Sequence, residues 1–332
     1  MRRFLPLLFA PVLALAQDAP APAVFAPKIE RFDPAFDKLL APDAKLEKLA
    51  EGFQWSEGPV WKDGALYFSD VPDNKIYRLV PGEKARIFLQ PSGGVEQKSP
   101  ALVPGSNGMT VDGKGHLIIC QQGTRRVIRL EADGKQVPLV DIYRGKHFNS
   151  PNDVVMTRSG QLYFTDPPYG LDGLNDSPLK ELPFNGVFRV MPWGEVTLII
   201  KDLTFPNGIA FSPDEKTLYI AVSDPNDAKL YAYDVQPDGT VANRRVFFDS
   251  TKLVTEQRVG LPDGMKVDAH GNVYVCAAGG VLVVSPEGKH LGSIITGQQT
   301  GNCAWGDDGS TLYICANMFI CRIKTLTKGA GW

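Results

Sequence analysis

The sequence predicts an all-β fold, a six-bladed β-propeller with four-stranded antiparallel blades, and three observations lead to this prediction. A strand of the Leu-Tyr-Phe type recurs six times along the 332 residues. An amide or carboxylate side chain stands nine to eleven residues before each copy. No helical period of useful length interrupts these strands. A repeat of this length is one supersecondary unit stacked against its neighbours, so the six polar side chains are expected to converge on one axis.

Each repeat unit can be followed strand by strand. The six copies of the repeated strand are residues 66–70, 117–120, 162–166, 218–221, 273–276 and 312–315. Their aromatic and β-branched residues favour strands, and each copy follows a turn such as Asp63-Gly64. A further strand is expected over residues 75–79, 126–130, 186–190, 229–233, 280–284 and 319–323. A fourth strand follows in five units, for example over 85–89, 196–200 and 245–248.

The two ends of the repeat predict how the ring closes. The sixth unit stops at Trp332 after three strands, while residues 45–50 form an orphan strand before the first unit. We expect this strand to complete the last blade, which closes a ring whose blades have short, protected edges. A long β-sandwich is the alternative, but it would not hold one polar residue in phase six times. The long loops 167–184 and 249–261 are expected to lie over or around the axis.

The N-terminus is predicted to be a secretory signal over residues 1–16, with cleavage after Ala16. Arg2-Arg3 precedes an apolar run over residues 4–15, and the run ends in small residues. The run is too short to span a bilayer, so we expect an exported protein, periplasmic or secreted, with no membrane attachment after cleavage. An Ala/Pro-rich leader is expected over 17–40 and a single propeller domain over 41–332.

The composition limits the classes of binding partner and indicates the state of the cysteines. The net charge of −2 provides no basic footprint for nucleic acid, and we expect a monomer. The five cysteines are an odd number, so at least one is unpaired. Three of them share one position of the repeated strand, as small buried hydrophobes do. One disulfide among Cys303, Cys315 and Cys321 stays open as an alternative, and the spacings match no zinc motif.

The residues held in phase form an all-oxygen set. They are Glu57, Asn107, Asn152, Asn207, Asp263 and Asn302. Pro-Asn-Gly and Pro-Asp-Gly are ordinary turn sequences when taken singly, but every unit already has a separate turn. Carboxylates and amide oxygens without His or Cys are the ligands that Ca²⁺, Mg²⁺ and Mn²⁺ prefer. Two carboxylates would repel each other in a narrow channel without a metal, so we expect one divalent cation on the axis.

Five phrases of the chain resemble one known family. Residues 57–61, 149–155, 164–170, 206–208 and 262–265 closely resemble the gluconolactonase/regucalcin family of sugar-lactone hydrolases, over nearly the whole mature chain. The resemblance implies a six-bladed propeller with one axial divalent cation, Ca²⁺ first, with Mn, Mg, Zn or Fe as alternatives. It implies Glu57, Asn207 and Asp263 as ligands, and Asn152 as a fourth ligand or a substrate contact.

The resemblance also implies a reaction, the opening of an aldonolactone to its aldonic acid. In the mechanism that we infer, the cation stabilises the developing oxyanion and Asp263 acts as the base. The candidate substrate contacts are Asn107, Asn152, His147, Asp166, Tyr169 and Asn302. Relatives often have Glu-His where this chain has Gln121-Gln122, and Arg where it has His147, so the identity of the lactone stays open.

Two other functions compete with lactone hydrolysis. An esterase or phosphotriesterase could use the same axial cation on another substrate. A propeller that binds a ligand or partner without catalysis is the second alternative. A strictosidine-synthase-like propeller without metal is disfavoured because Glu57 and Asp263 are both present. No phosphate loop follows a strand and opens a helix, so we expect no nucleotide cofactor.

Overall fold

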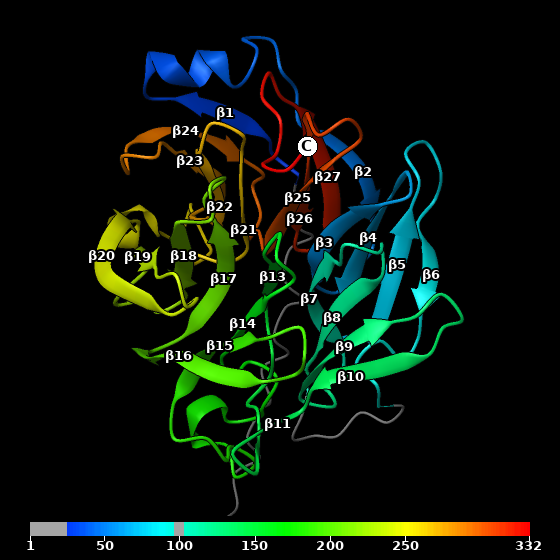
Figure 1. Ribbon diagram of the computed structural model, residues 1–332. Coiled ribbons are helices and arrows are strands. Elements are labelled where there is room, and N and C mark those ends of the chain that lie inside the picture. The colour runs from blue at the N-terminus through cyan, green and yellow to red at the C-terminus, as the bar shows by residue number, and fades with distance from the viewer. Residues whose placement is uncertain (1–24, 96–102) are drawn as a thin grey trace, which may run out of the picture.

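The protein is a ring of six β-sheets around a central axis. The structure is a computed structural model that describes residues 25–95 and 103–332 (Figure 1). Four-stranded antiparallel order recurs in every blade, and one blade carries a fifth strand. The predicted all-β, six-bladed propeller is therefore confirmed. The predicted signal, residues 1–16, and leader residues 17–24 lie outside the described residues.

The blades follow one another in chain order. The first blade consists of β3 (Ser56–Lys62), β4 (Ala65–Asp70), β5 (Lys75–Leu79) and β6 (Arg86–Leu89). The second consists of β7 (Ser106–Val111), β8 (Leu117–Gln121), β9 (Arg126–Leu130) and β10 (Gln136–Val140). The third consists of β13 (Val154–Met156), β14 (Leu162–Asp166), β15 (Asn185–Val190) and β16 (Val196–Leu203). The fourth consists of β17 (Pro206–Phe211), β18 (Thr217–Val222), β19 (Lys229–Val235) and β20 (Val241–Asp249).

The last two blades recruit strands from the N-terminal segment. The fifth consists of β21 (Met265–Val267), β22 (Val273–Ala277), β23 (Gly280–Val284), β24 (His290–Ile295) and the added β1 (Lys28–Arg31). The sixth consists of β25 (Asn302–Gly306), β26 (Thr311–Ala316), β27 (Phe319–Lys324) and β2 (Glu47–Glu51). The antiparallel pairing of β2 with β27 closes the ring, as the orphan strand predicted.

The first strand of each blade lines the axis. Figure 1 shows β3, β7, β13, β17, β21 and β25 around the centre, and neighbouring inner strands contact one another around the whole ring. The core lies between adjacent blades, where the buried aromatic and aliphatic residues of the repeated strands meet. All five cysteines are buried and none forms a disulfide, so the bridge left open among Cys303, Cys315 and Cys321 is absent.

The N-terminal segment is part of the fold from residue 25 onward, which differs from the predicted boundary at residue 41. Strand β1 pairs with β24 over four residues, and the short helix η1 (Pro34–Lys38) follows it. Phe36 of η1 is buried in the core between the fifth and sixth blades. The Ala/Pro-rich composition of this segment predicted a leader outside the propeller. Strand β1 was not predicted because it has only four residues and its pairing partner, β24, lies far along the chain.

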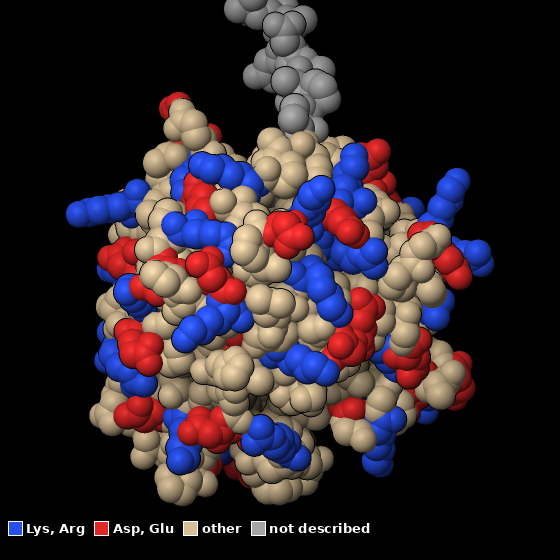
Figure 2. Space-filling view, turned by 90° about the horizontal axis from the view of Figure 1, so that it is seen from above, with Lys and Arg blue, Asp and Glu red and all other residues tan. Residues whose placement is uncertain are grey.

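The connections at one end of the ring contain the remaining elements. They are the hairpin β11 (Ile142–Tyr143) with β12 (Lys146–His147) and the short helices η2 (Leu174–Asp176) and η3 (Thr251–Leu253). On the face that Figure 2 shows, Lys and Arg are interspersed with Asp and Glu and form no single basic patch. No helix among residues 25–95 and 103–332 is long and apolar enough to cross a membrane.

Candidate functional site

The six in-phase side chains stand at the same end of the six inner strands. Glu57, Asn107, Asn207 and Asn302 are the first or second residues of β3, β7, β17 and β25. Asn152 and Asp263 come two residues before β13 and β21. Each inner strand runs antiparallel to its neighbour in the blade. The pairing of β3 with β4 shifts register between Glu57 and Val60, and β7 and β17 show a shift at the equivalent place.

In four of the six units a glycine follows the polar residue, and its packing leaves no room for a side chain. A Cβ atom on Gly58 would collide with the backbone of Asn107, and one on Gly208 with the backbone of Asp263. The amide of Gly108 donates to the carbonyl of Asn152 at 2.7 Å. Glycine is therefore required where one blade approaches the next, and the Asn-Gly and Asp-Gly pairs mark blade contacts around the axis.

Five of the six residues line one cavity at this end of the axis. Its volume is about 320 Å³. Its walls are formed by Trp55, Glu57, Val71, Pro72, Val103, Asn107, Gln122, Asn152, Tyr169, Asn207, Ser223, Leu261, Asp263 and Gln299. Tyr169 and Leu261 come from the two long loops, as expected from their length. Asn302 is buried outside this lining, where its Oδ1 accepts from the amide of Cys303 at 2.9 Å.

Two carboxylates, the buried Glu57 and the half-buried Asp263, give this end of the cavity its electrostatic character. Burial, opposed by the hydrogen bond from the Gly58 amide and helped by the charge of Asp153, raises the pKa of Glu57 to about 7. Burial and the charges of Glu57 and Asp153 hold the pKa of Asp263 well above its usual range. Like charges in a buried site disfavour ionisation, so this floor favours a bound cation.

Asn207 leaves an oxygen available at the same floor. Its Nδ2 donates to the hydroxyl of Ser223 at 2.9 Å, and that hydroxyl donates to the carbonyl of Pro262 at 2.5 Å. These bonds orient the amide, and among the described residues no donor reaches the buried Oδ1 of Asn207. A buried acceptor without a partner is costly unless a ligand satisfies it. The oxygen-only donor set of Glu57, Asn207 and Asp263 therefore fits a hard divalent cation.

Asp153 is a buried carboxylate of the axis that sequence reasoning missed. Its oxygens accept from the amides of Val154 and Ile209, and burial raises its pKa while the charge of Lys266 lowers it. It follows Asn152 directly, and Asp153 falls outside the one-per-blade phase that identified the other residues. The Pro-Asn-Asp phrase was the available signal, since a second polar residue there has no counterpart in the other blades.

The other predicted substrate contacts divide into two groups. Tyr169 lines the cavity, and its ring stacks on Phe205 with centroids 5.8 Å apart. Asp166 and His147 do not belong to the lining. Asp166 is fully buried and accepts from two backbone amides. The side chain of His147 is exposed on the hairpin.

The neighbouring glutamines also differ in their surroundings. Gln122 lines the cavity, whereas Gln121 is buried outside it and donates to the carbonyl of Ser92 at 2.8 Å. Trp55, Leu261 and Gln299 were missed because they lie in irregular segments that carry no periodic signal. Of the two positions, only Gln122 can therefore contact a ligand in this cavity.

The fold and the site together define a six-bladed β-propeller with an acidic, oxygen-lined cavity at one end of its axis. Residues 55–317 match the family model described as SMP-30/gluconolactonase/LRE-like region. A curated protein of Zymomonas mobilis named gluconolactonase is 41% identical over 310 residues, which cover 91% of this chain and 87% of that protein. The chain belongs to the SMP-30/gluconolactonase/LRE-like family.

Solved structures agree with this assignment. A structure described as a gluconolactonase of Xanthomonas campestris superposes with a TM-score of 0.78 at 30% identity, over 92% of this chain and 97% of that one. A calcium-binding regucalcin of Agrobacterium tumefaciens superposes with a TM-score of 0.68 at 19% identity, over 87% of this chain and 96% of that one. At that identity, the regucalcin likeness concerns the fold alone.

Proposed function

We propose that this protein hydrolyses the ring ester of a sugar lactone of the gluconolactone type and releases the aldonic acid. The observation that carries the proposal is the pair of carboxylates Glu57 and Asp263, which line the cavity with the unpartnered oxygen of Asn207. The names of the relatives from Zymomonas mobilis and Xanthomonas campestris support the choice of substrate.

One divalent cation is part of the proposal. Glu57, Asn207 and Asp263 would hold it, with Asn152 as a fourth ligand or a substrate contact. Ca²⁺ is the first candidate, with Mn, Mg, Zn or Fe as alternatives, since all the donors are oxygens. When bound, such a cation supplies Lewis-acid stabilisation of the charge that develops on the lactone carbonyl oxygen.

Asp263 is assigned the proton transfer. Its carboxylate takes a proton from the water whose oxygen attacks the carbonyl carbon. The bond between that carbon and the ring oxygen then breaks, and the proton passes to the leaving ring oxygen. Desolvation raises the pKa of the Asp263 carboxyl, and a bound cation would hold this group ionised, which the proton-accepting role requires.

The cavity walls suit an uncharged, hydroxyl-rich ring. Its volume of about 320 Å³ falls within the usual range for small-molecule sites. Among the described residues that line it there is no Lys or Arg, so nothing in that lining would pair with an anionic substituent. Asn107, Gln122 and Tyr169 can hydrogen-bond hydroxyl groups, and Trp55 offers an apolar ring face.

The test is hydrolysis of glucono-1,5-lactone by metal-stripped protein, followed by acid release. Ca²⁺, Mn²⁺, Mg²⁺, Zn²⁺ and Fe²⁺ are restored one at a time, and turnover is expected to return with at least one of them. A simple carboxylic ester and an organophosphate triester serve as parallel substrates. Turnover of either without lactone turnover would identify an esterase or phosphotriesterase. Cation binding without turnover of any substrate would indicate a non-catalytic propeller.

A further inference from the structure

Two of the six repeated strands end in aspartate. They are β4, which ends at Asp70, and β14, which ends at Asp166. The same position in the other blades is occupied by Gln121, Val222, Ala277 and Ala316. Asp70 and Asp166 are both buried, and neither lines the cavity. Two buried carboxylates outside the reaction site therefore need a separate explanation.

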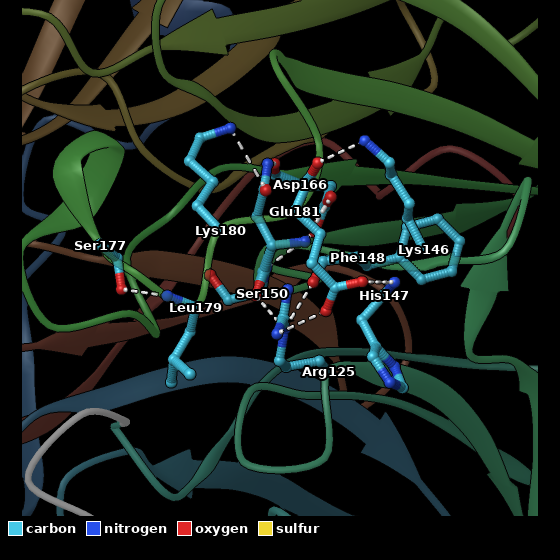
Figure 3. A network of polar contacts seen from close by, with 11 residues as sticks. Arg125, Lys146, His147, Phe148, Ser150, Asp166, Ser177, Leu179, Lys180 and Glu181 are labelled. Atoms are coloured by element: carbon cyan, nitrogen blue, oxygen red, sulfur yellow. Dashed lines mark hydrogen bonds and ion pairs between the residues drawn. The ribbon is translucent and has the colours of Figure 1, made fainter.

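Asp166 holds the segment that leads to Asn152. One carboxylate oxygen accepts from the amide of Asn149 and the other from the amide of Ser150, both at 2.8 Å. Figure 3 shows Asp166 and Ser150 at the centre of a polar network that also includes Arg125, Lys180 and Glu181. A carboxylate can accept both amides on separate oxygens, whereas an asparagine side chain has only one acceptor oxygen.

Asp70 makes the equivalent contacts in the first blade. Its Oδ1 accepts from the amide of Trp55 at 3.0 Å, and its Oδ2 accepts from the amide of Gln54 at 3.1 Å. The clamped pair Gln54 and Trp55 stands three and two residues before Glu57. The pair Asn149 and Ser150 stands at the same two distances before Asn152. The two contacts therefore repeat as part of the blade unit.

The network around Asp166 also reaches the loop that carries the cavity residue Tyr169. The hydroxyl of Ser150 donates to the carbonyl of Pro167 at 2.6 Å and accepts from the amide of Gly170 at 2.8 Å, on either side of Tyr169. These two bonds join the clamped segment to the loop that carries Tyr169 into the cavity.

Arg125 extends the same network toward Gln122. Its Nε donates to the carbonyl of Phe148 at 2.6 Å, and its backbone amide donates to the carbonyl of Gln122 at 3.2 Å. Its guanidinium pairs with Glu181 at 3.3 Å. Figure 3 shows these groups converging, with the ring of His147 directed away from them. Gln122, Asn152 and Tyr169 thus reach the cavity from loops that are bonded to one another.

We propose that Asp70 and Asp166 are positioning residues, which clamp the backbone before Glu57 and Asn152 and so set the geometry of the axial oxygens. The activity readout of this proposal rests on the proposed function, but the backbone contacts do not. A metal or substrate site loses affinity when its ligating side chains are displaced even slightly. The groups that orient those side chains therefore affect binding although they do not touch the ligand.

Asp268 provides a matched control. It is fully buried, and its carboxylate accepts from the amides of His270 and Asn272 at 2.9 Å each. It follows the end of β21, whereas Asp263 precedes the start of that strand, so Asp268 lies at the opposite end of the blade. It clamps backbone as Asp70 and Asp166 do, but it positions no residue of the cavity.

The experiment compares Asp70→Ala, Asp166→Ala and Asp268→Ala in the full chain. All three are expected to lower the thermal midpoint, because each removes the acceptor of two backbone amides. Calorimetric titration with Ca²⁺ is expected to show at least tenfold weaker binding for D70A. For D166A, the Ca²⁺ affinity or the KM for glucono-1,5-lactone is expected to change at least threefold. D268A is expected to keep both values within twofold.

The proposal is overturned if D70A and D166A keep wild-type Ca²⁺ affinity and KM, or if D268A loses as much as they do. Where an alanine variant does not fold, the asparagine variant carries the test, because it keeps one acceptor oxygen. Amide hydrogen exchange of residues 54–57 and 149–152 separates this proposal from the proposed function. Faster exchange there confirms the clamp even if wild-type protein binds no cation and opens no lactone, and unchanged exchange rejects it.

Discussion

Desolvation and the charge of Glu57 raise the pKa of Asp263, because both carboxylates line the same axial cavity. Glu57 itself has a pKa raised to about 7 by burial. A carboxyl group that is protonated in the cation-free protein must release its proton when a cation binds. The affinity for a cation is therefore linked to pH.

We predict that Ca²⁺ affinity rises from pH 6 to pH 8. The pKa of Glu57 is about 7, so a proton on this carboxyl competes with the cation below that pH and competes progressively less above it. The pKa of Asp263 is also raised, which adds to the competition on the acid side. The expected change is about tenfold per pH unit for each proton released. Calorimetry in two buffers of different ionisation enthalpy measures that release directly. Equal affinities at pH 6 and pH 8, with no proton release, would contradict the raised pKa values.

We predict that Asp263→Asn nearly abolishes turnover while the protein stays folded. The amide has nearly the shape of the carboxylate but cannot accept the proton of the attacking water. Loss of a general base costs on the order of 10²–10⁴-fold in rate. The measurement is kcat for glucono-1,5-lactone at saturating cation, with thermal unfolding as the test of folding. Asp268→Asn is the control, and undiminished kcat in the Asp263 variant would remove the proposed base.

We predict that Glu57→Gln weakens Ca²⁺ binding without removing it. The variant loses one of the negative charges but keeps an oxygen at the same place, and charge count tunes Ca²⁺ affinity. The expected loss is at least about tenfold, which corresponds to about 1.4 kcal/mol. Calorimetric titration checks the value, with the exposed Glu256→Gln on the neighbouring loop as control. An unchanged titration curve would exclude Glu57 as a ligand.

The period of the chain was enough to predict the blades, because blade formation depends on local strand patterns and on turns. The orphan strand predicted over 45–50 corresponds to β2, and five of the six in-phase residues line the cavity. Asn302 has the right phase, but it lies outside the lining, where its side chain hydrogen-bonds Glu57 and Asp153. Phase thus predicts which end of the strand a residue occupies, but it does not determine what that residue contacts.

The parts that could not be predicted depend on tertiary contacts. Strand β1 forms by pairing with the edge of β24, and the sequence of the N-terminal segment contains no signal that predicts this pairing. Asp166 was expected to contact substrate as part of the phrase 164–170, which resembles the family. Its two oxygens instead accept from the backbone amides of Asn149 and Ser150, in the loop that precedes the neighbouring strand β13. Loop conformations of this kind are decided by partners from another part of the chain.

We predict that Phe36→Ala lowers the free energy of unfolding by about 3–5 kcal/mol, the usual cost of removing a buried phenylalanine ring. Phe36 is 1% exposed and packs in the core between the fifth and sixth blades. Phe32, four residues earlier, is 56% exposed, so Phe32→Ala is the control and is expected to cost far less. Urea unfolding checks both. An equally small loss of unfolding free energy in both variants would show that the N-terminal segment is not part of the cooperative fold.

We predict that Gly301→Ala weakens Ca²⁺ binding more than it weakens the fold. A Cβ atom at Gly301 would collide with Oε1 of Glu57, while the nearest backbone atom, the carbonyl oxygen of Ser56, would stay 3.4 Å away. The end of a side chain can move aside at low cost, so the Glu57 carboxylate shifts and the backbone stays. Gly113→Ala is the control, because a Cβ atom there meets nothing within 4 Å. Calorimetry is expected to show at least about tenfold weaker Ca²⁺ binding for G301A, about 1.4 kcal/mol, with a change in unfolding free energy below that value. If G301A binds Ca²⁺ as tightly as G113A does, Glu57 does not have to occupy its observed position for the cation to bind.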